Sequence, residues 1–133
     1  MEIYGGCLCG MTRYVLTAEL QGLGDCHCVD CRRSAGAPYV TWGSVRPNEM
    51  RIVSGGVRKV PYVERLRYFA ECCGTHLFFK ENDASEWIDV TIASLDEPSG
   101  YAPQKIVWTE DKLPWVTLDP KLPSFPRRSS SGI

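Results

Sequence analysis

The sequence predicts a single, mainly β domain of short antiparallel strands with a few short helical turns. Its 133 residues match the usual size of one domain. Runs rich in β-branched and aromatic residues recur along the chain and favour strands. Turns that contain glycine or proline separate these runs, and helical periodicity is scarce. Seven cysteines lie in closely spaced clusters, which is typical of small metal-binding β folds.

The predicted strands follow one another at short intervals. The first covers residues 12–18, with the sequence TRYVLTA. The other short candidates cover residues 37–45, 51–55, 58–63, 65–70, 76–80, 87–95 and 104–110. One or two helical turns are expected after Val29. We predict one domain over residues 1–125 and a flexible tail over residues 126–133, which are rich in proline and serine.

Composition excludes some partners. The formal net charge is −1, and a chain without a basic field has little attraction for nucleic acid. No apolar run approaches the length of a membrane span. The first residues lack the basic and apolar segments of a secretory signal. We therefore expect a cytoplasmic protein that binds neither nucleic acid nor membrane, whose oligomeric state is not predicted.

The cysteines predict metal binding better than disulfides. Their number is odd, and cysteines this close together rarely reach the geometry that a disulfide needs. In a reducing compartment such clusters favour thiolate ligands for zinc. The clusters are Cys7 and Cys9, then Cys26, Cys28 and Cys31, then Cys72 and Cys73. The simplest partition joins the first and third clusters in one site and leaves the second as a separate site with three cysteines.

The three-cysteine site is one ligand short of a tetrahedron. Zinc with three thiolates carries a charge of about −1 and is a poor generator of hydroxide. Such a site suits an external thiol, which zinc would deprotonate while leaving it nucleophilic. Arg32 and Arg33 lie beside it in the sequence and are candidates to bind an anionic thiol. Alternatively, a side chain closes the site, for which Asp25, His27 and Asp30 are the candidates.

Four motifs together resemble the glutathione-dependent formaldehyde-activating enzyme family, also called GFA or centromere-protein-V-like. The motifs are GGCLCG, CHCVDCRRSAGAPYVTW, RYFAECCGTHL and KLPWVTLDPKLPSF, which extend from Gly5 to Phe125. The resemblance implies an Mss4-like zinc-binding fold with a structural and a catalytic zinc. By this resemblance Cys26, Cys28 and Cys31 hold the catalytic zinc, and the domain over residues 1–125 is GFA-like.

The implied activity is that of a zinc-dependent carbon–sulfur lyase. In the family reaction glutathione and formaldehyde form S-(hydroxymethyl)glutathione, so the expected partner is a small thiol such as glutathione. Tyr39 and Trp42 follow the cysteine loop and are candidates to line a substrate pocket, or else to pack in the core. The alternative from another class is a non-catalytic zinc-ribbon module with a binding or chaperone-like role.

The sequence departs from the family pattern at two positions. Ala70 stands where the resemblance places a cysteine of the structural site, so Cys7, Cys9 and Cys73 lack a fourth ligand. Cys72 can replace it only if a turn brings both neighbouring cysteines to one side. We therefore expect one or two zinc ions per chain. Lys105 occupies a position where family members often carry a histidine.

Overall fold

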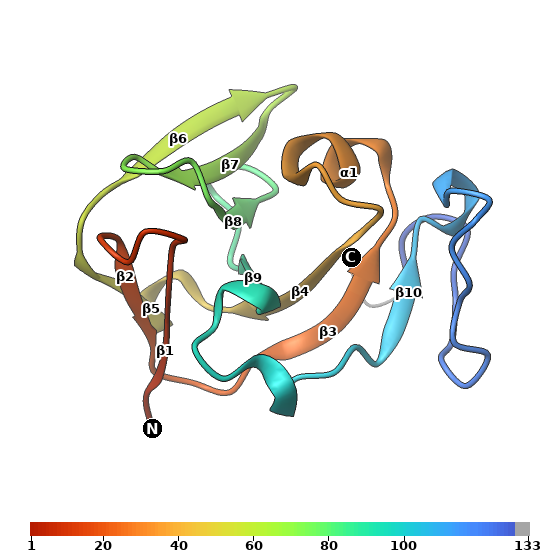
Figure 1. Ribbon diagram of the computed structural model, residues 1–133, viewed down its shortest axis with the longest axis horizontal. Coiled ribbons are helices and arrows are strands. Elements are labelled where there is room, and N and C mark those ends of the chain that lie inside the picture. The colour runs from red at the N-terminus through yellow and green to blue at the C-terminus, as the bar shows by residue number, and fades with distance from the viewer. Residues whose placement is uncertain (130–133) are drawn as a thin grey trace.

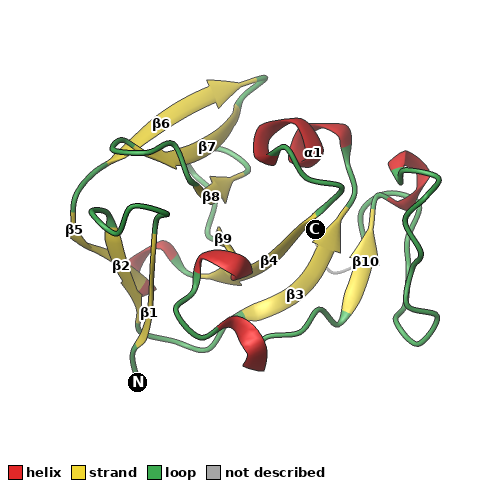
Figure 2. Cartoon of the chain, in the orientation of Figure 1, coloured by secondary structure: helices red, strands yellow, loops and turns green. Residues whose placement is uncertain are grey.

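The structure is a computed structural model that describes residues 1–129, in which ten short strands form two sheets (Figures 1 and 2). The smaller sheet is antiparallel and has the order β1-β2-β5. Its strands are β1 (Ile3–Gly6), β2 (Arg13–Leu16) and β5 (Met50–Ser54). Gly5 of β1 also forms an isolated antiparallel β-bridge with Leu95.

The larger sheet has seven strands in the order β10-β3-β4-β9-β8-β7-β6. Neighbouring strands are antiparallel except β10 and β3, which are parallel. The strands are β3 (Gln21–Cys26), β4 (Val40–Val45), β6 (Val57–Tyr62), β7 (Arg65–Ala70), β8 (His76–Lys80), β9 (Ile88–Thr91) and β10 (Lys105–Val107).

One short α-helix, α1 (Val29–Ala35), connects β3 to β4. Its N-cap is Cys28, whose sulfur accepts a hydrogen bond from the Cys31 amide at 3.2 Å. Gly36 ends the helix in the left-handed conformation with φ of 63°, as C-terminal glycines commonly do. The remaining helical turns are 3-10 helices, namely η1 (Pro47–Glu49), η2 (Ile92–Ser94), η3 (Pro98–Gly100) and η4 (Thr109–Asp111).

The prediction of a mainly β fold with short antiparallel strands and few helical turns is confirmed. Two predicted strands are too long, because residues 92–94 and 109–111 are 3-10 helices. Strands β1 and β3 were not predicted, since their sequences IYGG and QGLGDC contain two glycines each. In β3 one glycine has a packing reason: a Cβ on Gly24 would lie 3.0 Å from Cγ of Lys105. The Lys105 side chain therefore lies directly across the β3 backbone.

The main core lies between the two sheets. Tyr14 and Leu16 of β2 are fully buried and belong to the same cluster as Leu77 and Phe78 of β8. The rings of Tyr14 and Phe78 meet edge to face with centroids 5.0 Å apart. Apolar packing across the sheets thus holds the β1–β2 hairpin against the larger sheet.

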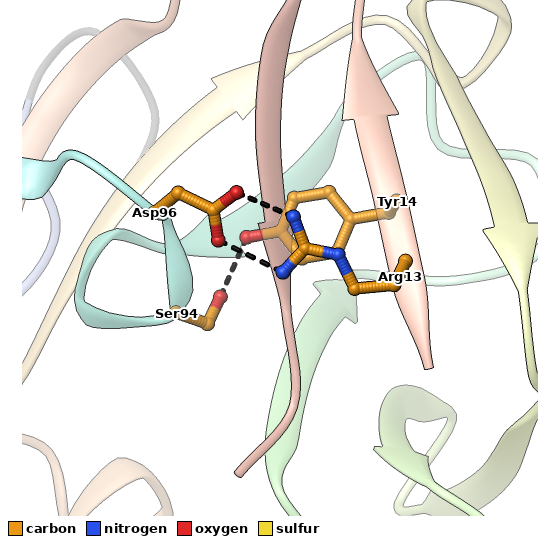
Figure 3. Close-up of polar contacts among 4 residues, drawn as sticks. All are labelled: Arg13, Tyr14, Ser94 and Asp96. Atoms are coloured by element: carbon orange, nitrogen blue, oxygen red, sulfur yellow. Dashed lines mark hydrogen bonds and ion pairs between the residues drawn. The ribbon is translucent and has the colours of Figure 1, made fainter. Parts of the chain in front are cut away.

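Polar contacts reinforce this attachment (Figure 3). Arg13 forms a two-pronged ion pair with Asp96, with Nη1 donating to Oδ1 at 2.8 Å. The Tyr14 hydroxyl lies 2.6 Å from Oγ of Ser94. Because Ser94 donates its own proton to the Thr91 carbonyl, Tyr14 is the donor in this contact. A Cβ on Gly5 would lie 2.3 Å from the Tyr14 hydroxyl, so the ring needs a glycine beside it.

We expect the change Tyr14→Phe to lower the free energy of unfolding by about 1 kcal/mol, because it removes one buried hydrogen bond and leaves the ring packing intact. Urea denaturation followed by circular dichroism measures this difference. The matched control is Tyr62→Phe, since Tyr62 is 62% exposed and its hydroxyl is not buried. Equal midpoints for the two variants would contradict the prediction.

The predicted tail begins at residue 126, and its first residues contact the domain. The Arg127 carbonyl accepts a hydrogen bond from the Trp108 amide at 3.1 Å. The side chains of Arg127 and Arg128 form ion pairs with Glu110 and Glu81. Residues 130–133 lie outside the described residues, and the domain boundary at residue 125 stays a prediction. Within residues 1–129, no helix has the length and apolar character needed to cross a bilayer.

Candidate functional site

The first and third cysteine clusters meet in space. Cys7 and Cys9 lie in the turn between β1 and β2, and Cys72 and Cys73 lie in the turn between β7 and β8. The four sulfur atoms are all within 4.8 Å of one another. The Cys7–Cys9, Cys7–Cys72 and Cys9–Cys72 sulfur distances are 3.7, 3.5 and 3.3 Å. Tetrahedral zinc with Zn–S bonds of about 2.3 Å places its sulfurs about 3.8 Å apart, so this group fits zinc.

A turn brings both vicinal cysteines to this group. The Gly74 amide donates to the Ala70 carbonyl at 2.8 Å, and Gly74 has φ of +78°, which favours glycine. Ala70 itself is buried in the main core and offers no ligand atom. The Thr75 hydroxyl forms a hydrogen bond that lowers the pKa of Cys73 to about 6. This arrangement supports Cys72 as the substitute fourth ligand, a role that stays a prediction.

The second cluster forms a separate group at the start of α1. Cys26 is the last residue of β3, Cys28 is the N-cap and Cys31 lies in the first turn of the helix. Their three sulfur atoms are within 4.8 Å of one another, and Cys26 and Cys31 are buried. Hydrogen bonds from Cys26 and Cys31 lower the pKa of Cys28, so its thiolate form is favoured. Three sulfurs with one stabilised thiolate are a suitable donor set for zinc.

No described side chain completes this group to four. Among residues 1–129, no other histidine, cysteine or carboxylate atom belongs to it. Asp25 instead accepts a hydrogen bond from the Thr41 hydroxyl at 2.6 Å. The His27 ring is buried and packs against the Tyr39 ring at a tilt of 33°, with centroids 4.8 Å apart. Within residues 1–129, this group therefore consists of three sulfur atoms without a fourth side-chain ligand.

Arg67 of β7 is the cation beside these sulfurs. Its Nη1 and Nη2 atoms lie 4.0 and 3.9 Å from the Cys31 sulfur. Nη1 also donates to Oγ of Ser34 at 3.1 Å, and the guanidinium lies 4.7 Å from the centre of the Phe79 ring. Arg67 is 8% exposed, so its charge is screened little by water. The sequence interpretation missed this residue, because only the pairing of β7 with β8 and the position of α1 reveal its neighbours.

Cys26, Cys28 and Cys31 line a cavity of about 620 Å³. Trp42, Phe79 and Trp108 supply apolar walls, and Arg67 lies among them. This volume is within the range of sites that hold small organic ligands. The three sulfurs therefore open toward a space of the size that a small peptide or cofactor occupies.

Of the four residues predicted to bind substrate, one is among the described residues that line the cavity and three are not. Trp42 lines the cavity and packs against Phe79, with centroids 6.0 Å apart. Arg32, Arg33 and Tyr39 are absent from the described lining. Val29, Asp30 and Cys31 of α1 line the cavity, and a substrate contact by Arg32 or Arg33 stays a prediction. Lys105, noted for its departure from the family pattern, does line the cavity.

Fold and site together define a small β domain with one closed group of four cysteines and one open group of three. A comparison with protein-family models matches residues 2–111 to GFA, the glutathione-dependent formaldehyde-activating enzyme family. The chain belongs to this family, which confirms the resemblance seen in its motifs.

Among solved structures, a crystal structure of a Rhodobacter sphaeroides protein is similar, with a TM-score of 0.57 and 22% sequence identity. The match covers 70% of this chain and 87% of that one, and it supports the fold alone. A comparison with curated proteins gives no match.

Proposed function

We propose that this protein is a zinc-dependent enzyme of the carbon–sulfur lyase type that joins a thiol to an aldehyde. The reaction that its family suggests is the addition of glutathione to formaldehyde, which gives S-(hydroxymethyl)glutathione. The observation that carries the proposal is the open group of Cys26, Cys28 and Cys31 on the wall of a cavity of about 620 Å³. A binding module without catalysis has no need for an open ligand position beside such a cavity.

The reaction balances without an oxidant or a reductant. The thiol sulfur forms a bond to the formaldehyde carbon, the C=O π bond breaks, and the proton lost by sulfur is gained by oxygen. Zinc held by Cys26, Cys28 and Cys31 would favour the thiolate form of the substrate near neutral pH. The buried guanidinium of Arg67 offsets the negative charge of the sulfurs. Trp42 and Phe79 exclude water from the same end of the cavity.

The direct test is exchange NMR on a mixture of formaldehyde and glutathione. The zinc-loaded wild type is expected to accelerate exchange with the adduct above the uncatalysed rate. The same protein after removal of zinc with a chelator is the control. An unchanged exchange rate with zinc-loaded protein would overturn the proposed reaction and favour the non-catalytic alternative. We place this reaction in the cytoplasm, where reducing conditions preserve thiolate ligands.

We expect the change Arg67→Met to weaken zinc binding at the three-cysteine group at least about tenfold. Zinc and three thiolates leave a charge of about −1, and methionine removes the buried cation that offsets it. Competition with a chromophoric chelator measures the affinity. Arg67→Lys keeps the charge and is expected to recover part of the loss, while Arg58→Met on the exposed strand β6 is the control. Equal zinc affinity in all of these variants would contradict a role for Arg67.

A further inference from the structure

A row of five side chains crosses the seven-stranded sheet along the cavity. Register pairs link Arg67 to Phe79, Phe79 to Asp89, Asp89 to Ser44 and Ser44 to Gln21. All five residues line the cavity. Because neighbouring strands are about 4.8 Å apart, Asp89 lies two strands, or about 10 Å, from Arg67 along the sheet, and the Arg67 guanidinium lies beside the Cys31 sulfur. The row therefore joins the cysteine end of the cavity to a second, polar end.

Asp89 is the buried acid of this polar end. It is 8% exposed, and the Ser44 hydroxyl donates to its Oδ1 at 2.5 Å. Burial raises the pKa of Asp89 to about 6, the Ser44 hydrogen bond opposes this shift, and the charge of Glu81 adds to it. The group is still mostly ionised at pH 7. A buried carboxylate whose hydrogen-bond donor is a neutral hydroxyl is well suited to a cationic ligand.

A positive side chain accompanies this acid. Lys105 lines the same cavity, and its charge lowers the pKa of Asp89, so the two groups interact. The absent side chain of Gly24 allows Lys105 to cross β3 toward this position. Its Nζ also donates to Oγ of Ser129 at 3.0 Å. The cavity that the three sulfurs line thus also presents a negative and a positive group.

We propose that Asp89 and Lys105 form a subsite for the α-amino-acid group of the substrate thiol. The ammonium would lie against Asp89 and the neighbouring carboxylate against Lys105. This proposal rests on the proposed function, because it assumes that the sulfur lies at the three cysteines. In glutathione eight bonds separate the sulfur from the α-ammonium, about 10 Å when extended, which is comparable with the two-strand spacing between Arg67, beside Cys31, and Asp89. The expected substrates are thus thiols that carry an amino-acid group at this distance.

Binding of a ligand whose sulfur is blocked tests the subsite without any turnover. The probes are S-methylglutathione and its N-acetyl derivative, titrated into the zinc-loaded full chain by calorimetry at pH 7. The wild type is expected to bind the free amine about tenfold more tightly than the acetylated form. Asp89→Asn keeps the size of the side chain and is expected to abolish this preference. Asp83→Asn, at an exposed acid that pairs with Lys59, is the matched control and is expected to preserve it.

Two results would overturn the subsite: equal affinity of the wild type for both probes, or an undiminished preference in a folded Asp89→Asn protein. The comparison of the two probes on the wild type needs no variant, so it decides even if Asp89→Asn does not fold. A failure of the proposed reaction can be told apart from a failure of the subsite. Selective binding without accelerated exchange would overturn the reaction and keep the subsite, whereas accelerated exchange without selective binding would overturn the subsite alone.

The same titration has an expected pH dependence. Affinity of the wild type for S-methylglutathione is expected to fall as the pH drops below about 6, because Asp89 then gains a proton. The ligand's α-ammonium keeps its charge there, since α-amino groups titrate near pH 8. Glu81 and Lys105 are the charged groups that act on Asp89, and Ser44 is its hydroxyl partner. The loss is expected to approach tenfold per pH unit and to be absent in Asp89→Asn.

Discussion

Replacement of Cys28 by serine is expected to remove one zinc ion per chain and to slow the accelerated exchange of glutathione with formaldehyde at least about 100-fold. The reason is specific to the position. Cys28 is the N-cap of α1, and serine is itself a favoured N-cap residue, so the helix should survive the change. What serine cannot supply is the third thiolate of the open group. Elemental analysis of zinc and exchange NMR measure the two effects on the same sample.

The control for this experiment is Ala35→Ser, which adds a serine at an exposed position of the same helix. It is expected to keep both the zinc content and the exchange rate. Circular dichroism should show the same secondary structure for both variants. A Cys28→Ser protein that retains its zinc and the wild-type exchange rate would refute both the metal site and the proposed reaction.

The change Cys72→Ser is expected to destabilise the fold more than any change at the open group. The sulfur of Cys72 lies close to the sulfurs of Cys7 and Cys9. Cys7 and Cys9 are in the turn between β1 and β2 of the small sheet, whereas Cys72 is in the turn between β7 and β8 of the large sheet. A metal held there would close a loop over a sequence separation of 63 residues, against 3 residues between Cys28 and Cys31. Constraining a long loop removes more entropy from the unfolded chain.

We expect Cys72→Ser to lose one zinc ion and about 3 kcal/mol of stability, or roughly 10 °C in melting temperature. Cys28→Ser is the matched comparison, because it also loses one zinc ion but is expected to lower the melting temperature much less. Thermal denaturation of the two variants at equal zinc concentration measures the difference. If both melt at the wild-type temperature, the four-cysteine group does not hold the sheets together.

The strands that could be predicted are those whose residues prefer an extended backbone by themselves. Residues 65–70 and 76–80 match β7 and β8, and each of these runs contains two aromatic side chains, which favour strands. Strand β3 is different, since QGLGDC has no such preference. Its extended form comes from pairing with β4 and β10, and Gly24 is required by the Lys105 side chain above it. Tertiary contacts of this kind are invisible in a local pattern.

The residues of the candidate site also differ in whether the local sequence could predict them. Cys26, Cys28 and Cys31 are close in sequence, so their spacing alone predicted that their sulfurs meet. Arg32 and Arg33 were candidate partners because they follow Cys31 in the sequence, and neither is among the described residues that line the cavity. Arg67 and Asp89 reach the cavity through the register of β7, β8, β9 and β4. Register depends on long-range pairing, so neither residue could have been found from its neighbours.

The side chains that line the two parts of the cavity come from different segments of the chain. This difference affects how the protein can diverge in evolution. All three sulfurs of the open group come from a single hexapeptide, Cys26 to Cys31, whereas the opposite wall takes one side chain from each of several strands. A point substitution at Asp89 or Ser44 alters that wall and leaves the hexapeptide untouched. Under the proposed function, such substitutions would change which thiol binds while the cysteine hexapeptide stays the same.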